Sequence, residues 1–387
     1  MIRLAEVFRQ FLPAYDATHR RSAQAHKVCR QINACRTPAL GGFRLQCANC
    51  DEVGFLYHAC RNRHCPRCQH KVSEAWEQAR LADVVDTPYF HLVFTLPHEL
   101  NGWARLHPSA IYSALFRSVW NTVNTLGQDK KRLSGQLGMT AVLHTWGQNL
   151  SQHIHLHCLI PGGALNARGE WHPAKSNYLF PVKVLSRLFR GRMVAALRDG
   201  LENGSLPRLT DQQSCGSTLN QLMNKDWVVY ARHCLSKPET VVRYLSRYTR
   251  KIALSESRLI NLDEHTVSFR YQDYRDHQKK VMTLEGDEFI RRFLQHVLPH
   301  GFMRIRHYGW LSNASRAKLL PKVRQAIAKP HEPYLQQETG TALSVPLHPV
   351  EQPDPFQGIP CCHCKQGMMV VVGRLRPAKA GLECICR

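Results

Sequence analysis

The chain has 387 residues, of which 43% are hydrophobic, so its length suits two or three domains with ordinary packed cores and a wholly disordered protein is disfavoured. Its 52 Lys and Arg residues outnumber its 29 Asp and Glu residues by 23, which indicates a polyanionic partner, nucleic acid first and an anionic membrane surface second. No apolar run approaches the roughly 18–20 residues that a membrane-spanning helix needs. The first residues include Glu6 and no small-residue cleavage site, so we expect no signal peptide and an intracellular protein.

The 15 cysteines gather at the two ends of the chain. Seven lie between Cys29 and Cys68 and five between Cys361 and Cys386, whereas the long middle holds only three. In a reducing compartment, cysteines clustered in this way more often bind metal than form disulfides. The sequence therefore predicts zinc modules at both ends of a Cys-poor middle.

The N-terminal segment begins with a predicted amphipathic helix before Pro13 and continues into the first group of cysteines. Two Cys-x2-Cys pairs are separated by 14 residues, close to the spacing of a four-thiolate zinc site, and predict one made by Cys47, Cys50, Cys65 and Cys68. A second site is predicted from Cys29, Cys35, Cys60 and His26. His58 and His64 are equally reachable as its fourth ligand. Three arginines among the thiolates are predicted to contact DNA phosphates, namely Arg61, Arg63 and Arg67.

The middle of the chain predicts alternating strands and helices. Strands are predicted at residues 88–97 and 139–146 and in the segment HIHLHCLIPGG, and a helix is predicted at 107–127. This order indicates an α+β domain with a largely antiparallel sheet. A basic amphipathic helix is predicted at 183–201, and the polar stretch from Glu202 to Ser217 is expected to be a linker or insertion.

The third predicted strand carries His153, His155 and His157. Because side chains of a strand alternate between its faces, all three imidazoles lie on one face, roughly 6–7 Å apart. A single histidine is more often a core or surface residue, but three on one face beside an apolar run favour a metal site. His155 and His157 are the predicted ligands and His153 the expected third, with His144 on the neighbouring strand or a group outside the sheet as alternatives.

A basic helix with two tyrosines is predicted from the segment KPETVVRYLSRYTRKIALS. Tyr244 and Tyr248 are one turn apart and emerge from the same face. Tyrosines at this spacing usually pack in a core, and a phenol with a pKa near 10 is a poor nucleophile unless cations or a metal-polarised phosphate assist it. The predicted helix supplies cations, which are expected to contact DNA: Arg243, Arg247, Arg250 and Lys251.

The C-terminal part predicts a hairpin, a helix and a basic aromatic strand between residues 267 and 311. Residues 330–360 are rich in Pro and Gln and are expected to be an extended linker. A further Cys-x2-Cys pair follows, and a third zinc site is predicted from Cys361, Cys364, Cys384 and Cys386.

Three features in this order resemble a known family: the segment CRTPALGG…CANC…CRNRHCPRCQ, the strand HIHLHCLIPGG and the helix YLSRYTRKIALS. Together they resemble the two-tyrosine HUH transposases of bacterial rolling-circle insertion sequences, often called the IS-ninety-one-like group, over residues 20–320. The resemblance implies a ferredoxin-like antiparallel sheet flanked by helices. It divides the chain into a zinc-binding DNA-recognition module at 1–82, an HUH nuclease domain at 83–325 with a helical insertion at about 183–235, and a C-terminal linker with a zinc knuckle at 326–387.

The resemblance also implies a chemistry. His155 and His157 would hold Mg²⁺ or Mn²⁺, which polarises the scissile phosphate, while Tyr244 and Tyr248 attack single-stranded DNA and form a 5′-phosphotyrosine link. Zinc in the Cys-rich modules would be structural. The implied partner is single-stranded or hairpin DNA at the ends of the element, in the bacterial cytoplasm and on the nucleoid. A plasmid-type replication initiator or relaxase is the closer alternative, and a non-catalytic zinc-dependent DNA-binding protein the more distant one.

Overall fold

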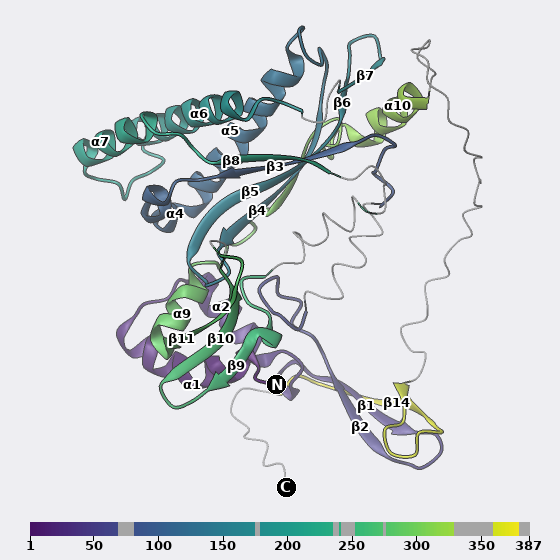
Figure 1. Cartoon of the computed structure of the whole chain (residues 1–387). Coiled ribbons are helices and arrows are strands. Elements are labelled where there is room, and N and C mark those ends of the chain that lie inside the picture. The colour runs from purple at the N-terminus through teal and green to yellow at the C-terminus, as the bar shows by residue number, and fades with distance from the viewer. Residues whose placement is uncertain are drawn as a thin grey trace.

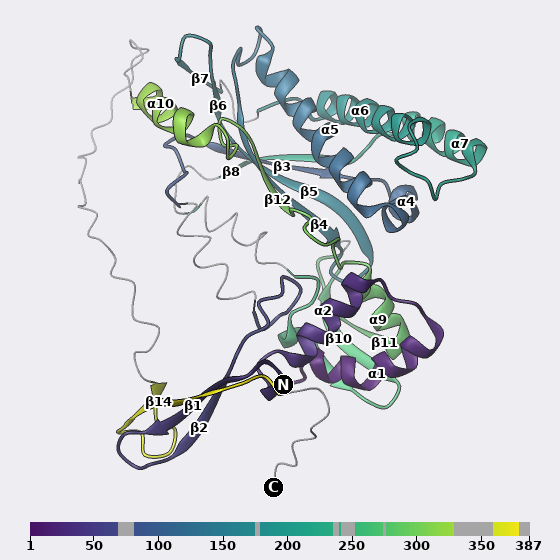
Figure 2. The same cartoon turned by 180° about the vertical axis from the view of Figure 1, so that it is seen from behind.

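The computed structural model describes residues 1–68, 81–174, 179–234, 240, 252–273, 276–328 and 359–378. The described residues form a large sheet covered by helices, a smaller helix-and-sheet body beneath it, and a narrow four-stranded sheet to one side (Figures 1 and 2). Each of these three parts has its own cluster of buried side chains.

A five-stranded sheet forms the centre of the first part, in the order β12-β4-β5-β3-β8. Its strands are β3 (Tyr89–Thr95), β4 (Gly138–Trp146), β5 (Gln152–Pro161), β8 (Val229–Cys234) and β12 (Ile305–Gly309). Every neighbouring pair is antiparallel. The strands β3, β4 and β5 are buried along nearly their whole length, because other elements pack on both faces of the sheet.

Helices cover one face of this sheet (Figure 1). They are α4 (Asn101–Leu106), α5 (Pro108–Gln128), α6 (Val182–Glu202) and α7 (Gln212–Met223). Their apolar sides meet the sheet in a large core, in which Phe94 of β3 packs edge-on against Phe189 of α6 with ring centroids 5.2 Å apart. A smaller cluster on the other face includes Trp310 and residues of α10 (Arg316–Ala328) and the hairpin β6 (Gly163–Leu165) and β7 (Trp171–Pro173).

The second part combines the N-terminal helices with a much later stretch of the chain. It contains α1 (Leu4–Thr18), α2 (Ala23–Ala34), α9 (Gly286–Leu294) and a sheet of β9 (Leu259–Leu262), β10 (Thr266–Gln272) and β11 (Lys279–Glu285), ordered β11-β10-β9. Phe8 of α1 meets Phe293 of α9 edge-on at 5.1 Å. The contact between α1 and α9 is close, since a Cβ added at Gly286 would meet the ring of Phe11 at 2.0 Å.

The third part joins the two ends of the chain. The hairpin β1 (Gly42–Cys47) and β2 (Val53–Tyr57) pairs with β14 (Met368–Leu375), which in turn pairs with β13 (Ile359–Pro360), in the order β13-β14-β1-β2. Figure 1 shows β14 lying beside β1 at the lower right. Three short 3₁₀ turns complete the described elements: Pro38–Leu40, His98–Leu100 and Glu256–Arg258.

The predicted α+β class, with an antiparallel sheet flanked by helices, an N-terminal Cys-rich module and a C-terminal Cys pair, is confirmed. The three strands predicted in the middle of the chain are β3, β4 and β5. Helix α1 continues through Pro13 to Thr18. The stretch from Glu202 to Ser217, expected to be a linker or insertion, contains the start of α7, which Asp211 caps by accepting a hydrogen bond from the Ser214 amide at 2.9 Å. The division at residues 82 and 325 stays a prediction, and the buried clusters cross both boundaries.

None of the described helices is both long enough and apolar enough to cross a membrane. Of the segment predicted as the tyrosine helix, the structure describes Thr240 and residues 252–255, and the rest falls outside the described residues.

Candidate metal centre and cysteine clusters

Three histidines meet on one face at the centre of the large sheet. His144 of β4 lies directly opposite His155 of β5 in the strand register, and His157 follows two residues later on the same face. The ligand nitrogens of the three lie within 4.8 Å of one another, and His155 Nε2 lies 3.1 Å from His157 Nε2. Two neighbouring nitrogens bound at about 2.0–2.1 Å to one ion are about 2.8–3.0 Å apart in octahedral and about 3.3–3.4 Å apart in tetrahedral geometry. The donor set therefore fits a single cation.

Neighbouring groups orient the imidazoles. His155 Nδ1–H donates to the carbonyl oxygen of His153 at 3.0 Å, which leaves its Nε2 lone pair available to an ion. His157 Nδ1 lies 3.0 Å from Nε2 of His91 on β3. Burial lowers the pKa of His91 to about 4, so this imidazole is neutral near pH 7. The sequence did not single out His91, although an isolated histidine inside an apolar strand was a usable signal.

The expected third ligand, His153, is not part of this group. Its side chain is exposed, and although its ring centroid lies 4.8 Å from that of His155, its ring nitrogens are not among the clustered ligand atoms. The third nitrogen comes from His144, which was one of the alternatives. The reason is the pairing of β4 with β5, which places the ring of His144 beside both His155 and His157, with centroids 5.3 and 4.5 Å away, whereas His153 lies at the exposed end of β5.

Four cysteines of the N-terminal segment form a first group, which we call the local cluster: Cys35, Cys60, Cys65 and Cys68. The Sγ atom of Cys68 lies 3.5 Å from that of Cys35 and 3.6 Å from that of Cys60, and Cys65 lies 3.7 Å from Cys35. Four sulfurs bound tetrahedrally at about 2.3 Å from zinc are about 3.8 Å apart. Hydrogen bonds from the neighbouring Cys60 and Cys65 thiols lower the pKa of Cys35, and the same contacts raise the pKa of Cys60 and of Cys65.

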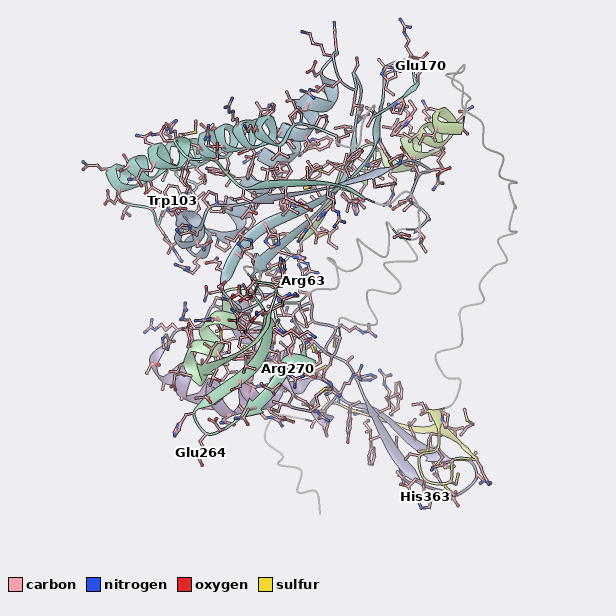
Figure 3. The ribbon with its side chains drawn as sticks, in the orientation of Figure 1. Arg63, Trp103, Glu170, Glu264, Arg270 and His363 are labelled. Carbon is pink, nitrogen blue, oxygen red and sulfur yellow. The ribbon has the colours of Figure 1, made fainter. Side chains whose placement is uncertain are left out.

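A second group, which we call the split cluster, draws two cysteines from each end of the chain: Cys47, Cys50, Cys361 and Cys364. Cys47 Sγ lies 3.7 Å from Cys364 Sγ, and Cys50 Sγ lies 3.7 Å from Cys361 Sγ. Both groups thus have the thiolate number and spacing of a closed structural zinc site. Figure 3 shows His363, within the C-terminal pair, at the tip of the narrow sheet.

The structure corrects the predicted ligand sets. The pairs Cys47-Cys50 and Cys65-Cys68 do not share an ion, because the β1–β2 hairpin carries the first pair to the tip of a separate sheet. Cys361 and Cys364 lie with Cys47 and Cys50. Their expected partners, Cys384 and Cys386, lie outside the described residues.

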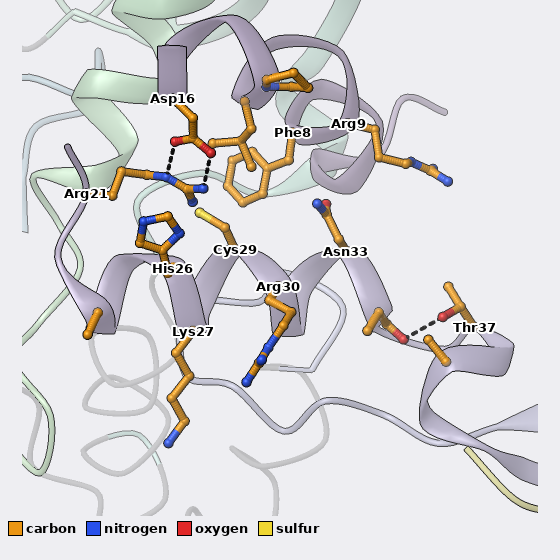
Figure 4. A pocket seen from close by; sticks show the side chains of 15 residues that line it. Phe8, Arg9, Asp16, Arg21, His26, Lys27, Cys29, Arg30, Asn33 and Thr37 are labelled. Atoms are coloured by element: carbon orange, nitrogen blue, oxygen red, sulfur yellow. Dashed lines mark hydrogen bonds and ion pairs between the residues drawn. The ribbon is translucent and has the colours of Figure 1, made fainter. Parts of the chain in front are cut away.

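Cys29 and His26 belong to neither cluster and instead line a cavity of about 890 Å³ between α1 and α2 (Figure 4). Burial raises the pKa of the Cys29 thiol to about 11, against the opposing effect of Arg21. The Arg21 side chain lies beside Cys29 in Figure 4 and is held there by hydrogen bonds to Asp16. Cys29 is therefore a protonated core thiol. Of the other histidines considered, His58 packs its ring edge-on against Phe43 at 5.2 Å, and burial lowers the pKa of His64 to about 3.

The arginines expected to contact DNA fall into two groups. Arg63 lies between the large sheet and the body below it (Figure 3) and donates to the carbonyl of Phe302 at 2.6 Å, and Arg67 donates to the carbonyl of Cys35 at 3.3 Å. Arg63 and Arg67 therefore make hydrogen bonds within the protein, although Arg63, like Arg61, is exposed. The remaining predicted contacts lie outside the described residues, together with both tyrosines: Arg243, Arg247, Arg250, Lys251, Tyr244 and Tyr248.

Comparisons with known proteins agree with this arrangement. Residues 138–318 match a family model described as "Putative transposase", and residues 7–96 match a model described as "Transposase zinc-binding domain". The chain is 38% identical over 387 positions to the protein named "Putative transposase y4qJ" of Sinorhizobium fredii, with 95% of this chain and 94% of that protein covered. It is 30% identical over 325 positions to the "Transposase for insertion sequence element IS801" of Pseudomonas savastanoi pv. phaseolicola, with 79% of this chain and 75% of that protein covered.

No solved structure matches the chain. The family models, the two relatives and the two four-cysteine clusters all lead to one assignment. The chain belongs to the transposases of IS91-type insertion sequences, and it carries the zinc-binding domain of that family at its N-terminus.

Proposed function

We propose that this transposase nicks and rejoins single-stranded DNA at the ends of its element through a 5′-phosphotyrosine intermediate. The observation that carries the proposal is the trio of His144, His155 and His157 at the centre of the antiparallel sheet. Positive charge beside the scissile phosphate assists attack by a tyrosine, and this trio has the donor spacing to hold a metal cation that would supply it. The excess of 23 positive charges suits a nucleic-acid substrate.

The three histidines are proposed to hold Mg²⁺ or Mn²⁺, which when bound would neutralise charge on the phosphate and orient it for in-line attack. The same nitrogens would also accept zinc, so the ligand set alone does not select the ion. The trio leaves the further coordination positions to phosphate oxygens and water. His91 is proposed to act as a positioning residue, because its contact at 3.0 Å fixes which nitrogen of His157 faces the ion.

Tyr244 and Tyr248 are proposed as the nucleophiles, and the described residues on either side of their segment support this. The chain enters the segment from β8, which pairs with β3 next to the histidine-bearing β5. It leaves the segment at Ala253, whose carbonyl accepts a hydrogen bond from Arg258, and Arg258 also donates to the carbonyl of Gln148 near the turn between β4 and β5. The segment therefore starts two strands away from β5, where Cys234 pairs with Tyr89, and ends beside the turn between the two histidine-bearing strands β4 and β5.

In the proposed reaction the phenol gives up its proton to solvent as its oxygen attacks the phosphorus, the bond from phosphorus to the 3′ oxygen breaks, and the leaving 3′ oxygen takes up a proton to give a free 3′-OH. The phosphotyrosine link keeps the bond energy for a later attack by a 3′-OH, so rejoining needs no ATP. With two tyrosines, one would hold the first cleaved strand while the other cleaves a second one. The zinc-binding domain is proposed to recognise the element ends.

The test incubates the full chain with a labelled single-stranded end and Mg²⁺ or Mn²⁺, and follows a protein–DNA adduct that survives SDS. The double variant Tyr244→Phe and Tyr248→Phe should give no adduct, whereas Tyr230→Phe, at an exposed tyrosine of β8, should behave like the unsubstituted chain. His144→Ala should reduce the adduct far more than His153→Ala. An adduct that persists without both tyrosines, or a complete lack of adduct with every end sequence, would show that the mechanism is wrong.

A further inference from the structure

We propose that the split cluster is a structural zinc site that fastens the C-terminal strand β14 to the N-terminal hairpin. The matched zinc-binding domain ends at residue 96, so it contains Cys47 and Cys50 but neither Cys361 nor Cys364. Cys50 and Cys361 are 311 positions apart in the chain and have their sulfurs 3.7 Å apart. The zinc site would thus be shared between the family's N-terminal domain and a segment that the domain model does not include.

Burial and spacing fit zinc held by four thiolates. Cys47 is 2% exposed and Cys361 1% exposed, so no water need complete the coordination on that side. The two cross-chain sulfur distances of 3.7 Å agree with the roughly 3.8 Å expected for a tetrahedral zinc–thiolate site.

Each pair of cysteines adopts the same turn. The residue directly after the second cysteine is Asp51 in one pair and Lys365 in the other. Each has a φ of +58°, a value that residues other than glycine seldom adopt. The same feature occurs in the local cluster, where Arg36 and Arg61, directly after Cys35 and Cys60, have φ values of +56° and +53°. Backbone strain that recurs beside clustered thiols indicates a shared requirement, which is to point several sulfurs at one centre.

Backbone amides are directed at the sulfurs. The amide of Asn49 donates to Cys47 Sγ and that of Gly367 donates to Cys364 Sγ, each at 3.3 Å. Donors of this kind stabilise thiolates, which are the form of cysteine that binds zinc. A side chain is not tolerated at residue 367, because a Cβ there would meet Cys47 Sγ at 2.6 Å.

The apolar core of this sheet is too small to hold β14 in place alone. Its buried residues are Leu45, Cys47, Cys361 and Met369, two of which are cysteines. Val370, Val371 and Val372 of β14 remain 41–49% exposed. In small modules a bound metal supplies the stability that a hydrophobic core cannot. Zinc at the split cluster would therefore keep β14 paired along β1, which otherwise becomes an unpaired strand edge.

The first test counts zinc in the full chain and in paired variants. The double variants Cys47→Ser with Cys50→Ser, and Cys361→Ser with Cys364→Ser, should each contain one zinc fewer than the unsubstituted chain. Cys362→Ser, at an exposed cysteine between the two C-terminal ligands, should lose none. Cys384→Ser with Cys386→Ser should also lose none. Loss of zinc in that last variant, or full zinc in either of the first two, overturns the shared site.

A second measurement needs no variant and so does not depend on the variants folding. Thiol alkylation followed by mass spectrometry should modify Cys362 at once, whereas the four thiols of the split cluster should become reactive together when a chelator is added. Hydrogen exchange at residues 368–375 should rise at the same chelator concentration. Independent reaction of the N-terminal and C-terminal pairs contradicts the proposal. These readouts use no DNA and remain informative whether or not the proposed strand transfer is correct.

Discussion

The local cluster lies against a large hydrophobic core, whereas the split cluster lies in a sheet with almost no core. Phe8, Phe269 and Phe289, all fully buried, belong to the same body of packed side chains as the local cluster. The split cluster has Leu45 and Met369 as its buried apolar neighbours. A zinc ion therefore adds to an existing fold in the first case and takes the place of a core in the second. Loss of either ion should reveal this difference.

The largest expected effect comes from the local cluster. Cys65→Ser with Cys68→Ser should lower the free energy of unfolding of the body formed by α1, α2, α9 and β9–β11 by at least about 3 kcal/mol, because the zinc site and its packing are lost together. Denaturant titration measures this change. As a control, Cys29→Ala removes a buried thiol outside both clusters and should cost only about 1 kcal/mol. An equal loss in both variants would mean that zinc contributes nothing beyond packing.

The core beside the local cluster can be tested without touching a cysteine. Gly286→Ala should destabilise the protein by about 1–3 kcal/mol, because the added Cβ would meet the ring of Phe11 at 2.0 Å and force α1 away from α9. Gly191→Ala is the matched control, since nothing lies within 4 Å of the added Cβ in α6, and it should be neutral or slightly stabilising. If Gly286→Ala is also neutral, the contact between α1 and α9 is not as close as described.

Acid should weaken the contact between the body formed by α1, α2, α9 and β9–β11 and the turn between β4 and β5 of the large sheet. His296 is buried, its Nε2–H donates to the carbonyl of Leu150 at 3.1 Å, and burial lowers its pKa to about 4. The unfolded chain binds a proton at this residue below about pH 6.5 while the folded chain does not, so stability falls as the pH drops from 6.5 towards 4. The expected loss is roughly 2 kcal/mol by pH 5.

Chemical denaturation at pH 7 and pH 5 measures the acid sensitivity. His296→Gln carries no titrating group and should show a smaller difference between the two pH values than the unsubstituted chain. The same difference in both proteins would assign the acid sensitivity to other groups.

The smallest effect on overall stability is expected at the split cluster. Gly367→Ala should weaken zinc binding at the split cluster by roughly 10–100-fold, because the added Cβ would meet Cys47 Sγ at 2.6 Å. The free energy of unfolding of the other two parts of the protein should change by less than about 0.5 kcal/mol. Competition with a chromogenic chelator measures the affinity. Gly373→Ala, at a glycine of the following strand β14, places the added Cβ 3.8 Å from its nearest neighbour and should keep the full affinity.

Local patterns in the sequence predicted β3, β4 and β5 and the helices around them, because strand and helix periods depend on neighbouring residues. The membership of each metal site depends on pairing between strands that are distant in sequence. The choice of His144 over His153 follows from the register of β4 and β5, and the partners of Cys47 follow from the pairing of β1 with β14. The spacing of Cys47-Cys50 and Cys65-Cys68 suited one site equally well, so spacing alone could not show that the hairpin separates them.

The split cluster also imposes an order on the making of the protein. Cys50 leaves the ribosome 311 positions before Cys361, which at a synthesis rate of 5–20 residues per second is a wait of roughly 15–60 s. During that time the N-terminal pair has only half of its ligands. A chain whose synthesis stops early never completes this site, so the completed four-thiolate site is a built-in mark of a chain that has been made at least as far as Cys364.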